Sequence, residues 1–150
     1  ISFLVPGQGQ VFTIDGEKLS AGYHGLSHHG NDPDKIAEFN QVGKKQVANF
    51  GRFLSVLNQK KDAEGRPLLE TTAVFYGSGM GNANTHNNSR LPALLAGGGY
   101  RHGAHHAIDR ENETKGTPLL GGLFLSIMES MGVGQERFVK ASRNMNDYLL

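Results

Sequence analysis

The chain contains no cysteine among its 150 residues. The residues shown therefore form no disulfide, and they offer neither a thiolate metal ligand nor a cysteine nucleophile. Any metal that binds to them must be held by nitrogen or oxygen atoms.

The sequence also lacks a long apolar run and a dominant charge. No stretch of about 18 apolar residues occurs, so we expect no membrane span, and no basic segment followed by an apolar one opens the chain as a signal peptide would. Fifteen Lys and Arg residues stand against fourteen Asp and Glu residues, which leaves a formal net charge of +1. Such a balance gives no electrostatic basis for binding nucleic acid or an acidic membrane surface, so we expect neither as a partner.

What is present suits a folded domain. A hydrophobic content of 37% in 150 residues is enough to build a core. The chain begins at Ile1, on an apolar run that looks cut within a strand, so we interpret it as the C-terminal part of a longer protein and expect the missing N-terminal part to be its partner. A trimmed but complete domain is the alternative. Either way we expect residues 1–150 to form a single domain, or a fragment of a larger α/β domain, with no internal boundary.

Histidines are concentrated in one stretch, Tyr23-His24-Gly25-Leu26-Ser27-His28-His29-Gly30, which holds three of the seven in the chain. His24 and His28 stand four residues apart. This spacing aligns two imidazoles on one face of a helix, and it also lets them converge across a tight glycine-rich loop. From the composition we expect a loop, and the imidazole pair predicts a site for zinc, iron or manganese.

A second polar loop contributes a third candidate ligand. Residues Gly77 to Asn88 follow an expected strand and are rich in glycine and asparagine, which is typical of a functional loop. His86 from this loop would complete a three-histidine set, and Asp109 or an asparagine oxygen would add a fourth ligand. The alternative is that these histidines only hydrogen-bond the loop backbone and bind nothing. The residues by themselves leave both interpretations open.

Two glycine-rich segments do not match catalytic motifs. Gly77-Ser78-Gly79 lacks the glycines two positions before and after serine that a nucleophile elbow requires, so we do not expect a serine triad. Gly97-Gly98-Gly99 is followed by no Lys-Ser or Lys-Thr pair, so it is not a P-loop. Tight packing of the backbone is its expected role.

Periodicity and turn residues predict alternating strands and helices. Asp32 and Pro33 start an amphipathic helix that continues to about Lys60, and its first amides should favour an anion. A second helix is expected from Thr117-Pro118 to Gly132, and the tail from Gln135 should be peripheral. Short strands are expected within residues 1–5, 11–14, 72–76 and 91–96. This order predicts an α/β fold with a mostly parallel sheet flanked by helices.

The histidine stretch resembles the signature of a bacterial protein family. His24-Gly25-Leu26-Ser27-His28-His29 matches the pattern His-x-x-Ser-His-His, which names a domain family of unknown function. The segment from Tyr76 to Gly99 resembles the strand-loop-strand block of that family, and Thr117-Pro118-Leu119-Leu120 and Met131-Gly132-Val133 resemble its closing helix. The resemblance covers most of the chain, from about Tyr23 to Val133.

That family is similar to the alkaline phosphatase and sulfatase superfamily, whose members hold two metal ions at the carboxyl ends of a parallel sheet. The resemblance implies an alkaline phosphatase-like fold and a periplasmic or extracellular location. It also implies that His24, His28 and His86 bind a divalent metal, either zinc, calcium or manganese. The residues implied to orient ligands or to bind substrate are Ser27, His29, Ser78, Asn82 and Asn84.

One position departs from the pattern of the superfamily. An aspartate-histidine pair usually follows the strand, whereas Ser78-Gly79-Met80 stands here and offers only a hydroxyl. The nucleophile would belong to the missing N-terminal part. We therefore expect a metal-dependent, hydrolase-like protein that acts on phosphate or sulfate esters of small molecules or polysaccharides, with no catalytic residue assigned. The alternative is a catalytically inactive binding module, or a structural domain, on the same fold.

Overall fold

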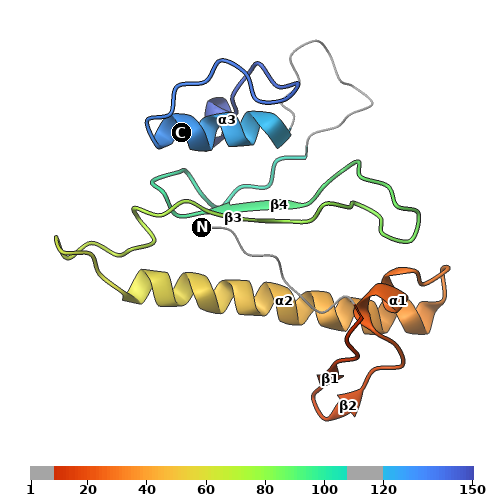
Figure 1. Ribbon diagram of the computed structural model, residues 1–150. Helices are drawn as coiled ribbons and strands as arrows, with labels where there is room; N and C mark the ends of the chain where they lie inside the picture. Colours follow the sequence, from red (N-terminus) through yellow and green to blue (C-terminus); the bar gives the residue numbers. More distant parts are fainter. Residues whose placement is uncertain (1–8, 108–119) are drawn as a thin grey trace. The chain divides into compact units, whose positions relative to one another are not determined.

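The structure is a computed structural model that describes residues 9–107 and 120–150 (Figure 1). Contacts divide the chain into two compact units, the first formed by residues 1–56 and 78–91, the second by residues 57–77 and 92–150. The strand expected at residues 1–5, the fourth ligand Asp109 and the helix start at Thr117-Pro118 lie outside the described residues. The single domain remains a prediction.

The first unit contains a small hairpin and a short helix. Strand β1 (Thr13–Ile14) pairs antiparallel with β2 (Glu17–Lys18) across a turn in which Asp15 and Gly16 both have positive φ. Helix α1 (Tyr23–Ser27) follows, so the loop expected around the first histidines is wrong, and a helical turn stands in its place. The core of this unit consists of Leu19, Leu26 and Val42.

Helix α2 (Pro33–Gln59) begins and ends close to where the sequence predicts, and all but its last three residues belong to the first unit. The Oδ1 atom of Asp32 accepts hydrogen bonds from the amides of Asp34 at 2.9 Å and Lys35 at 3.4 Å, so the predicted cap is confirmed. The free amides at the start of this helix therefore already have a carboxylate as their partner, that of Asp32.

The second unit contains a two-stranded antiparallel sheet. Strand β3 (Val74–Gly77) pairs with β4 (Ala93–Ala96), and Val74 lies opposite Ala96. The predicted mostly parallel sheet flanked by helices is therefore wrong, because both sheets in residues 9–107 and 120–150 are two-stranded and antiparallel. The physical reason is the connection: residues 78–92 contain no helix, and a parallel pair requires a long crossover, usually helical.

Helix α3 (Leu120–Ser130) and the short helix α4 (Asn146–Leu149) build the core of the second unit together with Tyr100. Met145 and Leu149 are buried in this core, so the expectation of a peripheral tail is wrong. Gly122 explains how the tail approaches α3, because a Cβ atom there would lie 2.6 Å from the carbonyl oxygen of Arg143. The buried hydroxyl of Ser126 then accepts a hydrogen bond from the amide of Met145 at 2.8 Å.

The glycine triplet after β4 has the structural role that the sequence predicts. Gly97, Gly98 and Gly99 all have positive φ, a region that favours glycine. A Cβ atom at Gly97 would overlap the carbonyl oxygens of Leu69 and Thr72. Only glycine lets the backbone segments approach this closely.

Among the helices that the structure describes, none combines the length and the apolar character needed to cross a membrane.

Candidate functional site

Three histidine rings from two segments of the first unit, helix α1 with its C-terminal end and the loop that contains His86, are in contact. His24 lies on α1, His28 is the residue that ends this helix, and His86 comes from the loop between β3 and β4. The ring centroids of His24 and His28 are 4.7 Å apart with an interplanar angle of 78°, and those of His28 and His86 are 4.8 Å apart at 71°. The fold thus brings together the three side chains that the sequence proposes as ligands, although it does so through a helical turn.

Local hydrogen bonds hold the two histidine-bearing segments together. The amide of Gly30 donates to Oδ1 of Asn84 at 2.9 Å, which links the end of the first segment to the second loop. The hydroxyl of Ser27 donates to the carbonyl oxygen of His24 at 2.7 Å and closes the helical turn. His86 has a φ of 51°, a left-handed conformation that few residues other than glycine adopt. A polar network therefore fixes the backbone beneath the three rings.

The histidine cluster has the right donors for a metal, but its rings are oriented toward one another. A metal lies in the plane of each imidazole that binds it, whereas here the edge of one ring meets the face of the next. Within residues 9–107 and 120–150, no group of three His, Asp or Glu side chains is arranged to hold a metal ion. The side chains of His24 and His86 are exposed, so rotation about their side-chain torsions meets little packing. Metal coordination would therefore require these rings to turn.

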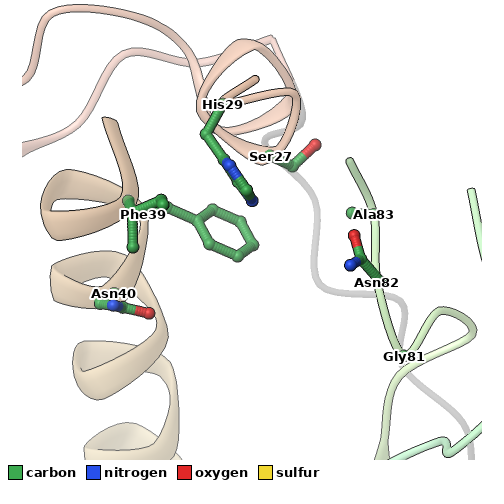
Figure 2. Close-up of a pocket in the computed structure, with 8 residues that line it drawn as sticks. Ser27, His29, Phe39, Asn40, Gly81, Asn82 and Ala83 are labelled. Atoms are coloured by element: carbon green, nitrogen blue, oxygen red, sulfur yellow. The ribbon is translucent and has the colours of Figure 1, made fainter. Parts of the chain in front are cut away.

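The first unit contains a pocket of about 240 Å³ that is lined in part by Ser27 and His29, the sequence neighbours of His28. Figure 2 shows His29 and Phe39 on one side and Asn82 on the other, with Ser27 next to His29. Most of the polar lining comes from the two histidine-bearing segments, because Ser27 and His29 flank His28, and Asn82 precedes His86 by four residues. Asn40 on α2 adds a further amide. The apolar part of the lining comes mainly from Phe39 and from Ile36, which lies about one turn earlier on α2.

Hydrogen bonds define what the pocket offers a ligand. Nδ1 of His29 accepts from the amide of Asn31 at 3.0 Å, so the neutral ring carries its hydrogen on Nε2. Oδ1 of Asn82 accepts from the amide of Thr85 at 3.3 Å, which leaves the Nδ2 group of Asn82 as the donor. Because the Ser27 hydroxyl already donates to a carbonyl, its oxygen is an acceptor. The pocket therefore presents donors and an acceptor beside an aromatic ring.

Two proposed site residues have other places in the structure. Ser78 exchanges hydrogen bonds with the backbone of Met80, at 3.0 Å to its carbonyl oxygen and 3.2 Å from its amide. It thereby closes a turn after β3 and does not line the pocket. Asn84 ties the two segments together and likewise does not line the pocket.

The amphipathic helix that the sequence predicts from Asp32 includes Ile36, Phe39 and Asn40, but no sequence pattern assigned them to a pocket. All three line the pocket. Their spacing contains a usable signal, since positions three and four apart share one helix face. A polar residue beside an apolar pair at the start of the helix, next to the histidine stretch, is the pattern found here at the wall of the pocket.

No family model matches the chain, and neither the curated proteins nor the solved structures provide a match. The geometry of the histidine cluster and of its pocket is therefore the basis for a functional assignment.

Proposed function

We propose that the chain belongs to a metal-dependent, hydrolase-like protein that acts on phosphate or sulfate esters, with His24, His28 and His86 as ligands of a divalent metal. The observation that carries this proposal is the contact between three imidazole rings from segments more than fifty residues apart. The resemblance of His24 to His29 to the His-x-x-Ser-His-His signature supports it. The same resemblance supports a periplasmic or extracellular location.

The chemical role proposed for each residue follows from the type of donor atom that it carries. Three neutral imidazoles form a donor set that suits zinc, and a bound metal would polarise an ester oxygen as a Lewis acid. The residues of the chain position this set: Ser27 holds the helical turn, and Asn84 holds the second loop against Gly30. No nucleophile is assigned to this chain. Ser78 is engaged with the backbone of Met80 and is not a candidate.

The test is metal content measured by mass spectrometry on the purified full-length protein. We expect about one zinc or manganese per chain, and we expect the His24→Ala/His28→Ala variant to lose it. The matched control is His105→Ala/His106→Ala, which removes the same number of histidines outside the cluster and should keep the metal. Zinc affinity, measured by competition with a chelator, should fall more than about 100-fold for His86→Ala, because loss of even an outer partner of a ligand costs about 10–100-fold.

Protein that contains metal would then be assayed with p-nitrophenyl phosphate and p-nitrophenyl sulfate. Hydrolysis that disappears in His24→Ala/His28→Ala and persists in the control variant supports the hydrolase. Metal that binds equally well to both double variants contradicts the proposed ligands. Absence of metal from every sample would contradict the proposal of a metal-dependent hydrolase. The pocket would then support the alternative, a catalytically inactive binding module.

A further inference from the structure

We propose that the pocket beside the histidine cluster binds the neutral, hydroxylated ring of the substrate, a single sugar unit, while the ester group lies at the cluster. The assignment of the ester rests on the proposed function. The assignment of the sugar rests on the pocket alone. In this proposal the sugar ring and the ester group of one substrate occupy two sites of different chemistry.

The absence of charged side chains around the pocket excludes an anion as its ligand. None of the residues that line it is Asp, Glu, Lys or Arg. His29 lines the pocket as well, and its Nδ1 accepts a hydrogen bond from the amide of Asn31. Bound phosphate or sulfate is usually paired with Arg or Lys, or with a helix N-terminus. At the nearby start of α2, the carboxylate of Asp32 already occupies the free amides. The group that enters the pocket is therefore uncharged.

The lining fits hydroxyl groups attached to an apolar framework. Side-chain amides both donate and accept hydrogen bonds, as hydroxyl groups do, and the pocket places Asn40 and Asn82 on opposite walls. Phe39 adds an aromatic surface, held in place by stacking on Tyr23 with ring centroids 5.2 Å apart. The C–H groups of a sugar ring pack against such a surface while its hydroxyls reach the amides. A purely apolar ligand would make no use of the Nδ2 donor of Asn82 or of the Asn40 amide.

The volume sets the size of the ligand. At about 240 Å³ the pocket is smaller than the roughly 300–1,000 Å³ that encloses drug-sized ligands. This volume suits a single sugar ring inside the pocket. Two of the lining residues, Ser27 and His29, are the sequence neighbours of His28, and this closeness along the chain is what links the pocket to the proposed ester site.

The experiment measures sugar binding to the full-length protein by saturation-transfer-difference NMR, after metal has been removed with EDTA. The probes are glucose, galactose and N-acetylglucosamine, with cyclohexanol as an apolar ring of similar size and inorganic phosphate as the anion. The test variant is Asn82→Asp, which keeps the Oδ1 acceptor for Thr85 and removes the Nδ2 donor. The matched control is Asn88→Asp, an exposed position of the same loop that does not line the pocket.

We expect at least one sugar to bind and its dissociation constant to rise about tenfold in Asn82→Asp, the range expected when a hydrogen bond is lost, and to stay unchanged in Asn88→Asp. No binding of any sugar, equal binding to both variants, or cyclohexanol binding as tightly as the sugars would overturn the proposal. So would phosphate binding that Asn82→Asp alone abolishes. Because the protein is free of metal, these outcomes are independent of the zinc measurement that tests the histidine ligands.

Discussion

At the scale of single residues, Asp62 shows how one carboxylate organises a turn. Its Oδ1 atom accepts from the amides of Glu64 at 3.0 Å and Arg66 at 2.8 Å, and its Oδ2 atom accepts from Nε of Arg66 at 2.9 Å. Burial acts to raise the pKa of Asp62, but these hydrogen bonds and the charge of Arg66 outweigh it and hold the pKa below 3.8. A carboxylate with a lowered pKa stabilises the folded state above its unfolded pKa, and this contribution disappears as the pH falls through the folded pKa.

We therefore expect the turn to weaken progressively as the pH falls through the lowered pKa of Asp62. An NMR titration of the Asp62 carboxyl should give a midpoint below the usual value for an aspartate, and Arg66→Gln should raise the midpoint by removing the charge and the side-chain donor. Glu64→Gln is the control, because the amide of residue 64 still donates and the midpoint should move much less. An unchanged midpoint in Arg66→Gln would show that the backbone hydrogen bonds alone lower the pKa.

At the scale of elements, the N-terminus of α2 is the feature that the sequence predicted best. Asp32→Ala removes the acceptor for two amides and should lower the free energy of unfolding by about 1 kcal/mol. Asp32→Asn keeps an Oδ1 acceptor at the same place and should lower the free energy by less. Urea denaturation followed by circular dichroism measures both variants. Equal losses in the two would indicate that the charge, acting on the helix dipole, matters more than the hydrogen bonds.

Elements of local origin were predictable, whereas their pairing was not. The cap at Asp32 and the positive φ of Gly97 follow from chemistry within a few residues. The direction of β3 relative to β4 is a long-range property that apolar periodicity does not encode, so the parallel sheet was predicted wrongly. For the site, the sequence named His24, His28 and His86, whose rings are in contact, but their role as ligands remains a prediction. The pocket formed by α2 required the tertiary fold.

At the scale of the whole molecule, the chain has two apolar cores that share no residue among those described. Leu26 has an exposed fraction of 0% in one core, and Leu123 has 6% in the other. Leu26→Val and Leu123→Val should each lower the free energy of unfolding by about 1–2 kcal/mol, because a buried methylene contributes about 0.8 kcal/mol and the cavity adds to the loss.

Since these two leucines have no packing partner in common within residues 9–107 and 120–150, the two losses should add in the double variant to within about 0.5 kcal/mol. Chemical denaturation of the wild type, both single variants and the double variant measures this sum. Val47→Ala is the control, because that side chain is 50% exposed and its truncation should change stability by less than about 0.5 kcal/mol. A double variant whose loss departs from the sum by more than about 1 kcal/mol would reveal energetic coupling between the cores. Additive losses combined with a single unfolding transition would instead show that each core contributes independently to one cooperative fold.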